Sequence, residues 1–408
     1  MSRENRWLLP EGVDELTPPE TWQLESLRRK LLDLYFSWGY ELVMPPFVEF
    51  LESLLTGTGS DLELQTFQLI DQLSGRTLGV RADMTPQVAR IDARNLQQNN
   101  PARLCYMGTV LHTRSDDFGG SRTPLQIGAE LYGHSGNTSD LEIIQLMLAS
   151  LDTAAIKSIY LDLSHVGILR GMAQQLQLPA AREAQLFEIL QRKALPDLNT
   201  WLAELNLPAS SAEILRTLAT LHGGREILPL AHQRLSSAPI EVQQALDTLE
   251  HISNAIIQRH PRLPIHLDLA ELRGYHYHTG LVFAVYATGQ GQEIARGGRY
   301  DEIGAVFGRA RPATGFSADL KTLLALSNQP VPESSGIYAP ASILGSADPA
   351  LENMIDQLRS QGQRVIRALE DEPDVPDSQE STAKLVNLGC NRILRQYNDS
   401  WYVQTLDA

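Results

Sequence analysis

The stretch RLCYMGTVLHTRSDDFGGSRTPLQIGAELYG, residues 103–133, decides the fold because it holds two apolar-rich runs joined by a polar loop. Each run is long enough for a strand, and serine, aspartate and glycine fill the loop, so the stretch predicts a long antiparallel hairpin. Side chains repeat every two residues along a strand, so Gln126, Gly128 and Glu130 should lie on one face. Gly128 leaves room for a molecule to lie against that face.

The sequence just before the hairpin predicts a strand pair followed by a loop with two polar side chains. Ser74-Gly75 forms a turn between two strand-like runs. Asp83 and Thr85 follow the second run, at its end. Thr85-Pro86 predicts a helix N-terminus with Thr85 as the cap and proline at the first helical position.

The N-terminal part predicts a helix and an interrupted strand. Apolar residues from Trp22 to Trp38 recur every three or four positions, which is typical of an amphipathic helix. Residues 39–50, GYELVMPPFVEF, form an apolar run that contains Pro45 and Pro46. Two prolines do not fit a central strand, so this run predicts an edge or interface strand.

Changes in composition after the hairpin predict the domain organisation. We expect a core over residues 1–326 that contains a helical insertion at about 167–260, where prolines separate stretches of helical period. A proline- and serine-rich linker follows at 327–335. Residues 336–408 then read as a small α/β module with an acidic loop. The fold class is α+β, an antiparallel sheet flanked by helices.

Composition excludes several classes of protein. The 408 residues carry 34 lysines and arginines against 49 aspartates and glutamates, a net charge of −15, which argues against nucleic-acid binding. No apolar stretch is long enough to span a membrane, and no secretory signal is visible. The two cysteines, Cys105 and Cys390, cannot form a disulfide framework. We therefore expect a cytoplasmic protein that does not bind a membrane.

Familiar catalytic and metal-binding signatures are absent. The chain has no P-loop, no H-E-x-x-H, no G-x-S-x-G and no C-x-x-C. His266, His276 and His278 match no familiar ligand spacing, and ordinary strand histidines are the preferred interpretation. We expect no catalytic residue, no metal and no cofactor.

The polar residues singled out suit a free amino acid. Carboxylates accept from an ammonium group, an arginine binds a carboxylate, and an amide or phenol can read a side chain. Candidates for these roles are Asp83, Thr85, Gln126, Glu130, Arg273 and Tyr277. On spacing alone, scattered residues of a solvated sheet edge would explain the same pattern.

Residues from about 20 to 326 resemble the catalytic core of a class II aminoacyl-tRNA synthetase, specifically histidyl-tRNA synthetase. GYELVMPPFVE resembles the first motif of that class, with Pro46 in the place of its proline, which implies a self-dimer. RADMT resembles the RPEGT substrate loop, and residues 106–133 resemble the second motif and the strand after it. LRGYHYHTGLVF resembles the signature RGLDYYTG, and GGRYD matches the synthetases letter for letter.

The resemblance implies that histidine-binding positions are kept whereas ATP-binding positions are lost. Asp83, Thr85, Gln126, Glu130, Arg273 and Tyr277 stand where the synthetase binds histidine, and His278 replaces a second tyrosine. Leu111, His112 and Arg114 replace the aromatic residue, arginine and glutamate of the second motif. Thr322 replaces the arginine of the third motif. The loop that meets tRNA carries Asp116 and Asp117, with Gly120 in place of an arginine.

This combination resembles a paralogous family, the regulatory subunits of ATP phosphoribosyltransferase, the first enzyme of histidine biosynthesis. The resemblance implies a non-catalytic subunit with histidine as allosteric effector and a short-form catalytic subunit as partner, typically in a hetero-octamer. It also implies that this subunit is needed for full activity and for feedback inhibition. Two alternatives stay open: a divergent active histidyl-tRNA synthetase, and a stand-alone histidine sensor. The C-terminal module would be a remnant of the anticodon-binding domain.

Overall fold

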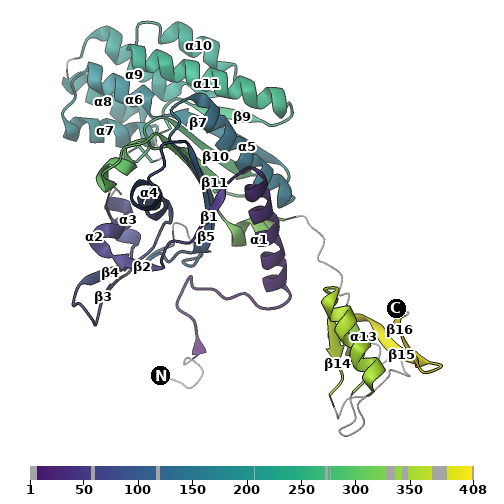
Figure 1. Ribbon diagram of the computed structural model, residues 1–408. Coiled ribbons are helices and arrows are strands. Elements are labelled where there is room, and N and C mark those ends of the chain that lie inside the picture. Colours follow the sequence, from purple (N-terminus) through teal and green to yellow (C-terminus); the bar gives the residue numbers. More distant parts are fainter. Residues whose placement is uncertain are drawn as a thin grey trace. The chain divides into compact units, whose positions relative to one another are not determined.

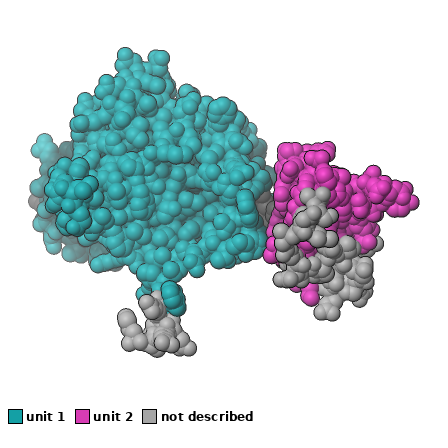
Figure 2. Space-filling view, turned by 60° about the horizontal axis from the view of Figure 1, so that its bottom comes forward, with its two compact units in different colours: residues 1–329 teal, residues 330–408 magenta. Residues whose placement is uncertain are grey.

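A computed structural model describes residues 7–56, 60–115, 120–205, 207–271, 274–275, 277–327, 336–341, 348–369 and 384–406. The chain forms two compact units, residues 1–329 and 330–408 (Figure 2). The acidic loop at 370–381 and all but the first residue of the expected linker lie outside the described residues. Each unit is described by itself.

Unit 1 is built on a nine-stranded sheet in which most neighbours are antiparallel. Its order is β1-β5-β6-β12-β11-β10-β7-β9-β8, with parallel pairs at β1–β5 and β7–β9. The strands are β1 (Glu41–Val43), β5 (Ala102–Thr109), β6 (Leu125–Tyr132), β7 (Ile159–His165), β8 (His222–Gly223), β9 (Ile265–Asp268), β10 (Leu281–Ala287), β11 (Glu293–Arg299) and β12 (Ala313–Asp319). The expected hairpin is β5–β6. The run at 39–50 was predicted as one strand but forms two, β1 and Val48–Phe50, at the edges of different sheets, because Pro45 and Pro46 interrupt it.

Helices cover one face of this sheet, where the main core lies (Figure 1). They are α1 (Glu20–Ser37), α5 (Asn137–Thr153), α11 (Ile240–Arg259) and α12 (Leu320–Leu326). In α1 the apolar period buries Leu27, Leu31 and Tyr35. Gly39 ends the helix with a positive φ of 82°, which lets the N–H of Tyr40 reach the carbonyl of Tyr35.

A smaller layer lies on the opposite face of the sheet. It contains a three-stranded sheet of order β2-β4-β3, with β2 (Val48–Phe50), β3 (Gln68–Ile70) and β4 (Thr77–Val80). Short helices accompany it: α2 (Leu51–Leu54), α3 (Ser60–Gln65), α4 (Thr85–Arg90), the π-helical η2 (Ile91–Leu96) and the 3₁₀ helix η3 (Ile303–Phe307). A second core, which includes Met84, Val88 and Tyr106, packs between α4 and the large sheet. Helix α4 begins at Thr85 itself, so Thr85 is not its cap, and that expectation was wrong.

The region at 167–260 is almost entirely helical. It comprises α6 (Gly167–Gln175), α7 (Ala180–Gln191), α8 (Leu195–Leu205), α9 (Ala209–Thr220), α10 (Ile227–Arg234), the short β8 and α11. Pro179, Pro208 and Pro239 stand immediately before α7, α9 and α11. Proline is tolerated there because the first N–H groups of a helix have no intrahelical acceptor.

Unit 2 is a four-stranded sheet of order β14-β13-β15-β16 against which helix α13 packs. Its elements are β13 (Gly336–Ala339), α13 (Pro349–Ser360), β14 (Val365–Arg367), β15 (Cys390–Tyr397) and β16 (Ser400–Thr405). Asp348 caps α13 by accepting from the N–H groups of Ala350 and Leu351. Asn398 and Asp399 make the turn between β15 and β16 with φ of 47° and 59°.

Candidate functional site

The candidate site lies on the face of the large sheet away from α5 and is organised by β6. Leu104, Tyr106 and Gly108 of β5 stand opposite Glu130, Gly128 and Gln126 of β6. On its other side, β6 pairs with β12, where Gly315 is opposite Glu130. Residues directly opposite one another share a face, so Gln126, Gly128 and Glu130 do lie together.

Glu130 is the deepest polar group of the site, with 1 % of its surface exposed. Tyr106 Oη donates to its Oε1 at 2.9 Å, and Tyr300 Oη donates to its Oε2. Burial outweighs these two hydrogen bonds and raises the pKa of Glu130 to about 8. At neutral pH Glu130 is therefore mainly the neutral acid in this structure.

Asp83 and Thr85 form the rim, held in place by β5 and β6. Gln126 Nε2 donates to Asp83 Oδ1 at 2.7 Å, and its Oε1 accepts from the N–H of Met84 at 2.9 Å. The N–H of Thr85 donates to the same Asp83 Oδ1 at 3.0 Å. Instead of capping α4, the Thr85 hydroxyl lies 3.1 Å from Tyr106 Oη and joins the rim to the Glu130 network.

Tyr277 supplies an aromatic wall with an unused polar atom. Its ring stacks on Tyr300 with centroids 5.1 Å apart, and its buried Oη has no hydrogen-bond partner among the described residues. Such a group usually has a partner in a complete site, so this hydroxyl fits a ligand contact. Burial raises the pKa of Tyr277 well above its usual value, so the hydroxyl stays protonated.

His278 lies beside Tyr277, with the two ring centroids 5.3 Å apart. Burial lowers the pKa of His278 to about 4, so its imidazole is neutral near pH 7. Its buried Nδ1 also has no hydrogen-bond partner in the described part of the chain. Arg273, the predicted carboxylate-binding residue, lies outside the described residues, as do Asp116 and Asp117.

Glycines form the floor beneath these side chains. A Cβ at Gly315 would overlap the Glu130 carboxylate, and one at Gly128 would overlap the Tyr106 phenol. A Cβ at Gly298 would press on the His278 ring. The close approach of three polar side chains to the sheet therefore depends on the absence of side chains below them.

Two residues of the site were not predicted, Tyr106 and Tyr300. Tyr106 lies opposite Gly128 and could have been found by extending the two-residue alternation to the partner strand. Tyr300 belongs to GGRYD, a segment that matches the synthetases but whose tyrosine was given no role. It reaches Glu130 from 170 positions away, a contact that strand alternation cannot predict.

Three positions, His112, Arg114 and Thr322, are predicted to have lost the ATP-binding residues of the synthetases. Their side chains either bond elsewhere in the chain or are exposed. His112 Nε2 lies 2.8 Å from the carbonyl oxygen of Ala82, and the side chain of Arg114 is exposed. Thr322 donates its hydroxyl to Asp319 at 2.8 Å, within the cap of α12. The neighbouring Lys321 donates to Asp14 at 2.8 Å. Asp14 places a carboxylate next to this end of the sheet.

No group of three or more His, Cys, Asp or Glu side chains that could hold a metal occurs among the described residues. His266 lies on β9, and its Nδ1 is 2.8 Å from Asp162 Oδ1. Cys105 and Cys390 are both buried free thiols.

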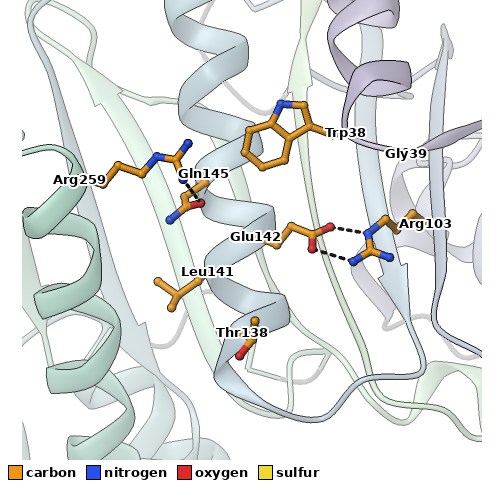
Figure 3. Close-up of a pocket in the computed structure, with 8 residues that line it drawn as sticks. All are labelled: Trp38, Gly39, Arg103, Thr138, Leu141, Glu142, Gln145 and Arg259. Carbon is orange, nitrogen blue, oxygen red and sulfur yellow. Dashed lines mark hydrogen bonds and ion pairs between the residues drawn. The ribbon is translucent and has the colours of Figure 1, made fainter.

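A separate hollow of about 490 Å³ lies among α1, β5, α5 and α11 (Figure 3). Arg103 donates from Nε and Nη2 to Glu142 at 2.6 and 2.8 Å across it, and Arg259 donates to Gln145. It is lined by Trp38, Gly39, Arg103, Thr138, Leu141, Glu142, Gln145 and Arg259. None of these is a predicted site residue.

As a whole, the site around Glu130 presents a neutral acid, phenols, an amide and a carboxylate that converge on one small face. These groups can bind and orient a small polar molecule. The described residues that surround Glu130 offer hydrogen-bonding groups suited to recognition, and which molecule they bind stays a prediction.

Comparisons with known proteins show the family to which the chain belongs. The family model for histidyl-tRNA synthetase matches residues 12–323, and the model for the ATP phosphoribosyltransferase subunit HisZ C-terminal domain matches 334–404. The chain is 55 % identical to an ATP phosphoribosyltransferase regulatory subunit of Thioalkalivibrio sulfidiphilus and 52 % identical to one of Pseudomonas syringae pathovar tomato, with 100 % of each chain covered.

A solved structure shows the same fold. The chain is similar to a crystal structure of an ATP phosphoribosyltransferase regulatory subunit/histidyl-tRNA synthetase from Bacillus halodurans, with a TM-score of 0.79 and 25 % identity. The match covers 95 % of this chain and 98 % of the other. The predicted α+β fold, with its large helix-flanked sheet and C-terminal module, is confirmed.

Proposed function

The chain belongs to the ATP phosphoribosyltransferase regulatory subunits, and from this premise we propose how it takes part in the first step of histidine biosynthesis. It binds a short-form catalytic subunit, raises its activity, and carries the site through which histidine inhibits the complex. Catalytic residues are contributed by the partner, and this subunit uses no cofactor or metal.

The observation that carries the effector role is the cluster of buried Glu130, Tyr300 and Tyr277, in which the Tyr277 hydroxyl has no hydrogen-bond partner among the described residues. Asp83 and Thr85 would bind the ammonium group of histidine, and Glu130 and Tyr277 its imidazole. Arg273 is assigned the carboxylate. The neutral His278 would lie near the imidazole in place of the tyrosine of the synthetases, and the carboxamide of Gln126 fixes Asp83 for its role.

Loss of synthetase activity is supported by the two positions, His112 and Thr322, that stand in place of arginines. Charge develops on phosphoryl oxygens during adenylation, and removing one such stabilising group commonly lowers the rate by about 10²–10³. His112 Nε2 lies against the carbonyl of Ala82 and Thr322 donates to Asp319, so neither position supplies a guanidinium for a phosphate. Asp14 adds negative charge beside Lys321.

We also propose a self-dimer through the Pro46 segment, within a hetero-octamer. Supporting this, Leu42, Met44, Phe47 and Val48 expose 42, 80, 47 and 40 % of their surface around the two prolines. We call these four residues the apolar face. Large apolar side chains exposed together in one short segment are typical of an interaction site.

Nucleic acid is not expected to bind, because the chain is acidic. Among the described residues, no helix has the length and apolar character needed to cross a membrane. We propose that the complex works in the cytoplasm, in keeping with the two free thiols.

The test is ATP phosphoribosyltransferase turnover by a purified short-form catalytic subunit, with and without this chain, across a histidine titration. Stimulation that histidine reverses is expected. Glu130→Ala should still form the complex but lose sensitivity to histidine. If stimulation is absent at every ratio of the two subunits, the proposal is wrong, and histidine-dependent ATP–pyrophosphate exchange then tests the synthetase alternative. If Glu130→Ala is inhibited like the unmodified chain, the effector site lies elsewhere.

A further inference from the structure

Arg81 is a buried cation held by backbone carbonyls. It exposes 7 % of its surface, and its Nη1 donates to the carbonyl of Pro45 at 2.8 Å while its Nε donates to that of Thr109 at 2.9 Å. No carboxylate of the described residues forms an ion pair with it. Burial lowers its pKa. Burying a charge without a counterion lowers the stability of the fold. Stability alone therefore does not explain why an arginine is placed at this position.

Arg81 connects the segment that carries the apolar face with the strand beside the ligand site. The backbone N–H of Arg81 donates to the carbonyl of Phe47 at 3.1 Å, and its guanidinium lies over the Phe47 ring at 5.5 Å. Arg81 is only two residues before Asp83. Its side chain passes over Gly108, where a Cβ would overlap the guanidinium, and Gly108 stands opposite Gln126.

A second side chain makes the same connection from the other end of the rim. Gln87 exposes 1 % of its surface, and its Nε2 donates to the carbonyl of Pro46 and to Glu49 Oε1, both at 2.8 Å. In the sequence, Asp83 and Thr85 therefore lie between Arg81 and Gln87. The side chains of these two residues donate to the carbonyls of Pro45 and Pro46. A shift of the rim must move these prolines or break the bonds.

We infer that Arg81 is a positioning residue that couples occupancy of the Glu130 site to the apolar face, where a second copy of this chain docks. The inference rests on the proposed function and adds the route of regulation. A ligand ammonium drawn to Asp83 moves the segment from Arg81 to Thr85. Because a guanidinium is planar and donates in two fixed directions, it passes that movement to Pro45, whereas a lysine makes only a point contact.

Arg81→Lys tests the coupling when two constants are measured on the complex. One is the dissociation constant of histidine by calorimetry, and the other is the histidine concentration for half-inhibition of turnover. Arg311→Lys is the matched control, because Arg311 is also 7 % exposed but bonds Asp92 and the carbonyl of Asn100. We expect Arg81→Lys to keep binding and raise the ratio of half-inhibition to dissociation constant about tenfold, within the usual range of allosteric couplings.

An unchanged ratio in Arg81→Lys would overturn the inference, provided that the unmodified complex is inhibited. A complex that histidine does not bind or inhibit would instead contradict the proposed function, so the two failures are distinguishable.

A measurement without substitution covers the case in which Arg81→Lys fails to fold. Hydrogen–deuterium exchange of the unmodified chain is compared with and without histidine. We expect slower exchange both at residues 83–88 and at the amides of residues 41–44 and 47–50, with no change in α11. Protection confined to residues 83–88 and the Glu130 site would refute the coupling.

Discussion

Replacing Glu130 by glutamine should remove the contribution that this buried carboxyl makes to the pH dependence of the free energy of unfolding. The pKa of Glu130 is about 8 in the folded chain, against an ordinary value of 4.5. Between these values the folded protein keeps a proton that the unfolded chain has released, so stability falls as pH rises, by about 1.4 kcal/mol per pH unit. From about pH 6 to about pH 7.5 the decline from this group is therefore about 2 kcal/mol. Glutamine stays neutral and keeps both hydrogen bonds, one as donor and one as acceptor.

The assay is urea denaturation of both proteins at these two pH values, without histidine, followed by circular dichroism. The quantity compared is the change in the free energy of unfolding with pH, in which contributions from all other groups cancel. Glu142→Gln is a suitable control, since the bidentate bond from Arg103 helps to hold the pKa of Glu142 below its usual value, outside this range. Equal pH slopes for the unmodified protein and Glu130→Gln would mean that Glu130 is ionised in the empty site, and the reasoning from burial would fail.

Three further outcomes follow from other parts of the molecule. Tyr300→Phe removes a donor to buried Glu130 and should lower the free energy of unfolding by about 1–3 kcal/mol, measured by urea denaturation. Phe47→Glu places a charge on the apolar face and should shift sedimentation from dimer to monomer; an unchanged sedimentation coefficient would exclude this face as the contact. Asp399→Gly relieves a non-glycine φ of 59° next to Asn398 and should stabilise unit 2 by up to about 1 kcal/mol, seen as a higher melting temperature.

Local periodicity was enough to predict much of the structure around the site. The alternation in residues 125–132 correctly put Gln126 and Glu130 on one face, and the two prolines correctly marked a strand at a sheet edge. Both patterns depend only on residues that are close together in the sequence, so they can be recognised without the structure. Thr85 was misjudged as a cap because its hydroxyl bonds Tyr106, a partner on another strand.

What could not be predicted depends on which distant strands become neighbours. Strand β12 lies between β6 and β11, so residues 130, 300 and 315 meet although far apart in sequence. The burial that raises the pKa of Glu130 is a property of that assembly. The resemblance to the synthetases suggested the candidate histidine-binding positions, whereas the contacts of Tyr300, Arg81 and Gln87 with distant residues appear only in the folded structure.

The glycine floor has a consequence for how feedback control can be lost in a growing population. At Gly315 any larger side chain overlaps the carboxylate of Glu130, so under the proposed function a single methyl group acts like a change of Glu130 itself. Gly128 stands in the same relation to Tyr106. Selection for overproduction of histidine should therefore recover alleles at these codons as readily as at codons for contact residues. The mutational target for escape from inhibition is wider than the set of side chains that touch the effector.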